Sequence, residues 1–237
     1  MKEMYLFYTP QISGDLYVLP AGEARHCVRI LRLSVGDVLT LTDGKGGFYE
    51  GEITESSERE CLVRVLKKQE EYGKRGFRVH IAVAPTRHTD RMDWLLEKCV
   101  EIGIDEVTLF TTEHSVRRTL KLERLEKVMI AAMKQSLKAY LPTLNPIVDF
   151  RTFIDSCGDG QKFIAHCHSG EKKRLHEVYI KGEDALILIG PEGDFSETEI
   201  ELAVKAGFVP ISLGDSRLRT ETAGVVACHS VNLLNEL

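Results

Sequence analysis

The sequence predicts an α/β protein made of two parts, a small β-barrel followed by a parallel sheet with helices on both faces. Residues 1–70 contain short strand-like runs separated by turns, which is typical of a small barrel. Beyond residue 76, strand-like runs alternate with helical patterns, which is typical of a parallel sheet. A charged segment with two glycines, residues 69–76, separates the two patterns. We therefore expect one domain over residues 1–70 and a second over residues 76–237.

The expected barrel depends on three strand-like runs. Residues 38–42 and 48–53 flank a glycine-rich turn, and residues 61–66 alternate apolar and polar side chains. One segment, near residues 23–31, instead has a helical pattern in which arginines recur at spacings of four and three. Such spacing aligns side chains on one exposed helix face. The arginines are Arg25, Arg29 and Arg32.

The expected parallel sheet depends on five short strand-like runs. They cover residues 77–84, 107–110, 162–165, 185–189 and 208–213. Helical patterns cover residues 91–102, 120–140, 172–179, 197–206 and 221–234. Parallel strands need long crossover connections, usually helices, so this alternation predicts a sheet covered on both faces.

Composition favours a cytoplasmic protein without membrane segments. None of the apolar runs among the 237 residues approaches the roughly 20 residues of a membrane helix. The polar N-terminus is interrupted by Pro10 and Gly14, which argues against a signal peptide. Six scattered cysteines include no Cys-x-x-Cys pair, which argues against a zinc ribbon and a disulfide framework. We expect a soluble protein with reduced cysteines.

Charge is distributed unevenly along the chain. The formal net charge of −5 argues against nucleic-acid binding by the molecule as a whole. Residues 114–139, however, contain seven Lys and Arg against two Glu, whereas residues 184–237 contain nine Asp and Glu against three Lys and Arg. The first stretch is suited to a polyanion, and the alternative is a solvated helix face.

Two loops after expected strands are rich in glycine and polar residues. Residues 190–195 read GPEGDF, before a capping box of Ser196 and Glu199, and residues 213–224 read LGDSRLRTETAG. Ligands of open α/β sheets bind beyond the carboxyl ends of strands, so both loops are candidate ligand sites. The alternative is a pair of ordinary βα connections. Neither loop matches a Walker, dinucleotide-binding or nucleophile-elbow motif.

Together these loops resemble a known family. The chain resembles the RsmE family of bacterial 16S ribosomal RNA uridine-N3 methyltransferases, in the SPOUT superfamily. The resemblance is carried in order by HCVRILRLSVGDVLTLTDGKG, DRMDWLLEKCVEIG, QSLKAYLP, IGPEGDFSETEI and LGDSRLRTETA, and extends over nearly the whole chain. It implies a PUA-like RNA-binding barrel over residues 1–70 and a SPOUT methyltransferase domain with a trefoil knot over residues 76–237.

The resemblance also implies a cofactor, S-adenosylmethionine, bound in a pocket within the knot. Carried over to this sequence, the cofactor-binding residues are Ile189, Gly190, Pro191, Glu192, Gly193, Leu213, Gly214, Leu218, Arg219, Thr220 and Thr222. The acidic C-terminal region is compatible with a cationic sulfonium. We expect no metal ion, because the adjacent His166, Cys167 and His168 would point to opposite faces of a strand.

Methylation of uracil N3 requires that its proton leave and that the charge developing on the uracil oxygens be stabilised. We expect Arg219 to stabilise this charge, and Glu221 to orient Arg219 or accept the proton. His166 and His168 are the rival proton acceptors. Arg219 and Glu221 could also form an ordinary surface ion pair, which contributes little.

Phosphate contacts position an RNA-binding protein on its target. The expected RNA-binding residues are Arg25, Arg29, Arg32, Arg117, Arg118 and Lys138, each of which could instead be solvated surface. The chain departs from the family at Cys27, usually His, at His114 and Lys138, usually Arg, and at Asp194, usually Gly. These departures concern the RNA contacts more than the reaction.

The last helical pattern, residues 221–234, is apolar on more than one face, and such a helix is buried, often against another subunit. The family's homodimers pack there. The sequence therefore predicts a homodimer that methylates N3 of a uridine in 16S rRNA, within the assembled small ribosomal subunit. The alternatives are a SPOUT methyltransferase acting on tRNA or on ribose 2′-hydroxyls, and a non-catalytic RNA-binding adaptor.

Overall fold

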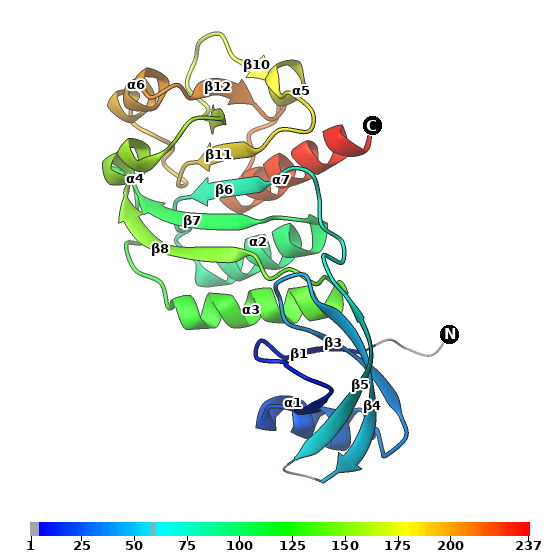
Figure 1. The fold of residues 1–237 in the computed structure, drawn as a ribbon. Helices are drawn as coiled ribbons and strands as arrows, with labels where there is room; N and C mark the ends of the chain where they lie inside the picture. Colours follow the sequence, from blue (N-terminus) through cyan, green and yellow to red (C-terminus); the bar gives the residue numbers. More distant parts are fainter. Residues whose placement is uncertain (1–4, 58–59) are drawn as a thin grey trace. The chain divides into compact units, whose positions relative to one another are not determined.

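The computed structural model describes residues 5–57 and 60–237, which form two compact units (Figure 1). The first unit contains the chain up to Lys74 together with Ile130–Leu141. The second contains Arg75–Met129 and Pro142–Leu237. The segment Ile130–Leu141 therefore packs with the first unit, although it follows the start of the second in sequence.

The first unit is built on a five-stranded sheet in the order β1-β3-β4-β5-β2. Its strands are β1 (Leu6–Tyr8), β2 (Leu16–Val18), β3 (Val38–Thr42), β4 (Phe48–Ser56) and β5 (Cys61–Gln69). All three strand-like runs predicted here are present, and β3 and β4 pair antiparallel across the glycine-rich turn. Alternate side chains of these strands, including Phe7, Leu41 and Ile53, form the core of the unit.

The predicted helical segment of this unit is present but irregular. It consists of α1 (Ala21–Arg25) and a π-helical turn, η1 (His26–Ile30), closed by a hydrogen bond from Leu31 N to His26 O. Arg32 follows with φ of 57°, outside the helix. The π-turn changes the angle between successive side chains, so the regular spacing of the arginines does not continue as one α-helical face.

The second unit contains a seven-stranded parallel sheet in the order β10-β12-β9-β11-β6-β7-β8, as the alternating patterns predict. Its strands are β6 (Val79–Val83), β7 (Glu106–Thr111), β8 (Thr143–Asp149), β9 (Gln161–Ala165), β10 (Lys173–Arg174), β11 (Ala185–Ile189) and β12 (Val209–Ser212). The central strands β6 and β11 are apolar along almost their whole length, because helices cover both faces of the sheet.

Helices pack on the two faces of this sheet (Figure 1). On one face, α7 (Thr220–Glu236) contacts β6 and β11 and packs against α2 (Thr89–Ile102). A Cβ at Gly224 would lie 2.5 Å from Leu95, so α2 and α7 approach closely there. On the other face, α4 (Phe150–Ser156) and α6 (Glu197–Lys205) share a core with Ala82, Ile164 and Leu188. The remaining helices are α3 (Leu122–Gln135) and α5 (Leu175–Val178).

Some elements differ from expectation for identifiable reasons. Strand β8 was not predicted from the sequence, because it contains Pro146 and a proline removes a backbone hydrogen-bond donor. The proline is tolerated because β8 is an edge strand. Helix α3 ends at Gln135 rather than near residue 140. Leu137 adopts a φ of 54°, which is incompatible with a right-handed α-helix. In the described part of the chain, no helix is long and apolar enough to cross a membrane.

Candidate functional site

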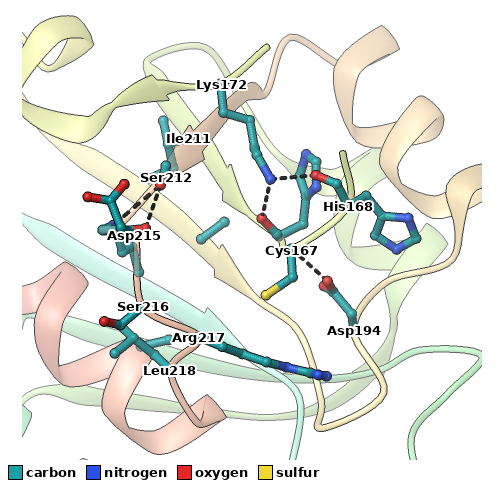
Figure 2. Close-up of a pocket in the computed structure, with 15 residues that line it drawn as sticks. Cys167, His168, Lys172, Asp194, Ile211, Ser212, Asp215, Ser216, Arg217 and Leu218 are labelled. Atoms are coloured by element: carbon teal, nitrogen blue, oxygen red, sulfur yellow. Dashed lines mark hydrogen bonds between the residues drawn. The ribbon is translucent and has the colours of Figure 1, made fainter. Parts of the chain in front are cut away.

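Two adjoining cavities lie where the parallel strands β9, β11 and β12 end. The larger cavity, of about 610 Å³, is bounded by the segments after β9 and β12 (Figure 2). The smaller cavity, of about 250 Å³, is bounded by the segments after β11 and β12. Residues shared by both cavities are Ala165, Cys167, Asp194, Arg217, Leu218 and Ala223. The two loops that the sequence marks as candidate ligand sites thus form one composite site.

Asp194 fixes the loop after β11. Its Oδ2 accepts a hydrogen bond from Cys167 N at 2.7 Å (Figure 2), and its Oδ1 accepts one from Phe195 N at 2.9 Å. The residue has a φ of 62°, a left-handed conformation that aspartate tolerates better than most residues. Aspartate can therefore replace the glycine usual in the family without breaking the loop, and its carboxylate links the loop to the end of β9.

The loop after β12 is tied both to itself and to the loop after β11. Ser212 Oγ donates to Gly214 O at 3.0 Å, and Gly214 has a φ of 146° that favours glycine. Thr220 Oγ1, in the first turn of α7, donates to Gly190 O at 3.0 Å. The buried Thr220 hydroxyl thereby holds the two loops together. The predicted capping box between Ser196 and Glu199 is confirmed.

A glutamate carboxylate extends this link to a third loop. Glu192 Oε1 accepts a hydrogen bond from Arg87 N at 2.9 Å, in the turn between β6 and α2. Arg117, in the segment after β7, donates from Nε and Nη2 to Arg87 O at 3.2 and 3.1 Å. Loops that follow three neighbouring strands are therefore connected by hydrogen bonds at one edge of the sheet.

The two predicted catalytic residues lie in different surroundings. Arg219 is exposed and lines the smaller cavity, and its guanidinium makes no hydrogen bond or ion pair with residues that the structure describes. Glu221 is only 7% exposed, and its Oε1 lies 3.6 Å from Arg91 Nε of α2. Glu221 Oε2 is buried without a hydrogen-bond partner. In this structure the Glu221 carboxylate therefore faces Arg91, and the expectation that Glu221 orients Arg219 or accepts the proton stays a prediction.

The two candidate histidines also differ. His168 Nε2 lies 2.7 Å from Phe195 O, so this nitrogen carries a proton and holds the backbone. His166 lines the larger cavity, and both of its ring nitrogens are buried without a partner. Burial, followed by the nearby charge of Lys172, lowers the pKa of His166 and favours its neutral form. Lys172 Nζ donates to the carbonyls of His166 and His168 (Figure 2).

Most of the expected cofactor-binding residues line these cavities. Those that do are Ile189, Gly190, Pro191, Glu192, Leu213, Gly214, Leu218, Arg219 and Thr220. Gly193 and Thr222 line neither cavity; the Cα of Gly193 is turned towards His114, whose side chain would lie 3.0 Å from a Cβ at this position.

The expected RNA-binding residues divide between the two units. Arg25, Arg29 and Arg32 are exposed in the first unit, which also contains the half-buried Lys138. Arg117 and Arg118 belong to the second unit. Arg117 holds the turn at Arg87, and Arg118 Nη2 lies 3.4 Å from Thr112 O.

Several residues in or beside this site were not predicted from the sequence. Arg87 and Arg91 follow β6, and Lys172 and Arg217 follow β9 and β12. The rule that ligands bind beyond the carboxyl ends of strands points to these loops as well. Nowhere in residues 5–57 and 60–237 do three or more His, Cys, Asp or Glu side chains gather as a metal site requires.

Comparisons with known proteins agree with this geometry. A family model described as "RNA methyltransferase domain" matches residues 74–232, and one described as "RNA methyltransferase PUA domain" matches residues 19–66. The "Ribosomal RNA small subunit methyltransferase E" of Buchnera aphidicola is 28% identical, over 97% of this chain and 92% of that protein. The protein of the same name from Bacillus subtilis is 25% identical, over 95% of this chain and 93% of its own.

Solved structures extend the similarity to three dimensions. A "probable rRNA-methyltransferase from Porphyromonas gingivalis" is 45% identical, with a TM-score of 0.93, covering 98% of this chain and 99% of that one. A "Ribosomal RNA small subunit methyltransferase E from Neisseria gonorrhoeae bound to S-adenosyl methionine" is 27% identical, with a TM-score of 0.90 and 98% coverage of both chains.

Proposed function

The chain belongs to the RNA methyltransferase family, and on that premise we propose that it transfers a methyl group from S-adenosylmethionine to N3 of a uridine in 16S ribosomal RNA. The observation that carries the proposal is the composite site at the ends of β9, β11 and β12, where Thr220 and Gly190 join the two loops. The similarity to small-subunit rRNA methyltransferases over almost the whole chain supports the substrate.

The residues of the site fit S-adenosylmethionine. A cavity of about 610 Å³ lies within the range of roughly 300–1,000 Å³ usual for small-molecule sites. The nitrogens of His166, which have no partner among the described residues, suit a polar ligand, whereas the carboxylates of Asp194 and Asp215 in the lining are already held by backbone N–H groups and by Arg174. The cofactor supplies an electrophilic methyl group when it is bound. The loops after β11 and β12 would hold it, and we propose that they form the trefoil knot.

Arg219 and Glu221 have distinct roles in this proposal. Arg219, whose guanidinium has no partner among the described residues, stabilises the negative charge that develops on the uracil oxygens as N3 loses its proton. Glu221 Oε1 lies 3.6 Å from Arg91 Nε, and we propose Glu221 Oε2, which is buried without a hydrogen-bond partner among the described residues, as the acceptor of that proton. His166 is the rival acceptor, because its neutral ring has free nitrogens.

We also propose that the enzyme is a cytoplasmic homodimer acting on the assembled small subunit. Helix α7 carries partly exposed apolar residues, among them Val225, Val226 and Leu233, which a second copy would cover. The PUA-like first unit, with its exposed arginines, would contact the RNA backbone. Sedimentation at micromolar concentration should give the mass of a dimer; a monomer would contradict this part of the proposal.

The activity can be tested on small subunits from cells that lack this gene. The purified protein is incubated with these subunits and methyl-labelled S-adenosylmethionine, and the digested rRNA is resolved by mass spectrometry. We expect the label in 3-methyluridine, with naked 16S rRNA and tRNA as parallel substrates. Label on a ribose or in tRNA would favour another SPOUT activity. Cofactor binding without any label would contradict the N3 assignment, and absence of both would favour an RNA-binding adaptor.

A further inference from the structure

In the turn between β6 and α2, hydrogen bonds hold the backbone of Arg87 but not its side chain. The buried Thr86 donates from Oγ1 to His88 O at 2.8 Å. Between them, Arg87 N donates to Glu192 Oε1 at 2.9 Å, and Arg87 O accepts from Nε and Nη2 of Arg117. Both backbone polar groups of Arg87 are thus held by charged side chains from other loops. This arrangement fixes where the Arg87 side chain begins.

The Arg87 side chain itself is exposed, and it makes no hydrogen bond or ion pair within residues 5–57 and 60–237. Arg217 and Arg219 are also exposed and unpartnered in the described chain, and both line the smaller cavity together with Glu192. The carboxylates that line this cavity, Glu192 and Asp194, already accept hydrogen bonds from backbone N–H groups. The edge of the site therefore presents three guanidinium groups without a protein partner.

Free guanidinium groups at the edge of a site recognise an anion, and their planar fork matches phosphate. Arg87 lines neither cavity, so its guanidinium is placed outside the space that fits the cofactor. The anion it meets should belong to the substrate rather than to the cofactor carboxylate. Building on the proposed function, we infer that Arg87 binds a backbone phosphate of the RNA next to the target uridine.

Glu192 is a positioning residue in this arrangement. Its carboxylate lines the smaller cavity and holds Arg87 N, so it couples the shape of the cofactor-side loop to the place of the phosphate-binding side chain. Arg117 completes the support from the segment after β7. Loss of either hydrogen bond would leave the Arg87 guanidinium charged but less well oriented. Poorer orientation weakens a bidentate contact with a phosphate more than it weakens a simple charge attraction.

The test measures KM, kcat and equilibrium binding for small subunits at several salt concentrations, with the full-length chain. We expect Arg87→Ala to raise KM about tenfold with kcat within about twofold, and to reduce the slope of log KM against log salt by about one. Arg87→Lys should keep the salt slope but recover only part of the affinity. Calorimetry should give an unchanged Kd for S-adenosylmethionine in both variants.

Two further variants sharpen the result. Arg151→Ala removes an exposed arginine of α4, away from the cavities, and should behave as the wild type in every measurement. Glu192→Gln should raise KM less than Arg87→Ala. The double variant should raise KM by less than the product of the two single effects, because both act on one contact.

Three outcomes overturn the inference. The first is an unchanged KM and an unchanged salt slope in Arg87→Ala, measured under conditions in which the wild type forms 3-methyluridine. The proposed function would then stand. An equal loss of cofactor affinity would assign the side chain to the cofactor carboxylate. A tenfold rise of KM in Arg151→Ala would show that the Arg87 result reflects the loss of any positive charge rather than a specific contact. If the wild type forms no 3-methyluridine, the proposed function fails, and subunit binding still reports separately on Arg87.

Discussion

His80 and His166 occupy two polar sites on one parallel sheet, and they differ in whether their ring nitrogens have partners. His80, on β6, has Nε2 2.8 Å from Thr108 Oγ1, and Asn145 Nδ2 donates to Thr108 Oγ1 and to Glu106 Oε1. His166, just after β9, has both nitrogens buried and unpartnered. Burial is the main cause of a lowered pKa in both.

The difference shows how a ligand site can be told from a structural network. The cavity beside His80, of about 450 Å³, is smaller than the one beside His166, of about 610 Å³, but larger than the one beside Arg219, of about 250 Å³, so volume alone does not separate the two sites. Hydrogen bonding does separate them, because a buried polar group without a hydrogen bond costs free energy unless a ligand or a water molecule supplies that bond. The His80 ring is hydrogen-bonded within the protein, whereas the buried nitrogens of His166 have no partner among the residues that the structure describes. We interpret the former as structural and the latter as functional.

The largest expected effect comes from Arg219. Arg219→Ala should lower kcat for methylation about 100- to 1,000-fold, because a donor aimed at developing charge contributes mainly in the transition state. The matched control is Arg78→Ala, which removes an exposed arginine paired with Glu106 beside the His80 network. Single-turnover methylation should change less than about twofold in the control. Equal losses in both variants would remove the distinction between the two sites.

The two histidines should separate cofactor affinity from stability. His166→Ala should weaken S-adenosylmethionine binding about tenfold, which corresponds to one hydrogen bond of about 1.4 kcal/mol, with little change in unfolding free energy. His80→Ala should leave the Kd unchanged but lower the unfolding free energy by about 1–3 kcal/mol, because Thr108 and Asn145 lose a partner. Calorimetry and urea denaturation measure the two quantities. The reverse pattern would exchange the roles of the two sites.

Two cysteines can report whether a ligand occupies the functional site or the cavity beside His80. Cys167 is exposed and lines both cavities of the functional site, whereas the half-buried Cys157 lines the cavity beside His80. S-adenosylmethionine at about ten times its Kd should slow alkylation of Cys167 about tenfold by occupying the site. Alkylation of Cys157 should proceed at its own rate with or without the cofactor. Peptide mass spectrometry distinguishes the two thiols, and protection of Cys157 alone would place the cofactor at the other cavity.

The smallest effect concerns pH. The pKa of His80 is lower in the folded protein than its ordinary value of 6.5, so the unfolded chain takes up a proton first as pH falls. The stabilising contribution of neutral His80 is therefore complete above about pH 6.5 and decreases below it, by at most about 1.4 kcal/mol per pH unit. Urea denaturation between about pH 7 and pH 5 should show a shallower decline for His80→Ala. Parallel curves for variant and wild type would contradict this.

The sequence by itself determined the fold class, most element positions and the family. Residues 38–42 and 185–189 form strands with the predicted bounds, because their apolar patterns are local and strong. The loops at residues 190–196 and 213–220 do form one site, as strand order in open sheets requires. The resemblance to the 16S rRNA methyltransferase family is confirmed by relatives that match over nearly the full chain.

Only the tertiary structure decided which side chains have partners. Glu221 faces Arg91 rather than the adjacent Arg219, and Asp194 binds the backbone of Cys167. Arg117, which stays a predicted RNA-binding residue, supports the turn that carries Arg87. Each of these contacts joins loops that are distant in sequence, and local spacing contains no information about such distances. The physical reason is that strand order and backbone conformation, such as the left-handed φ of Asp194, fix these contacts only when the whole sheet has formed.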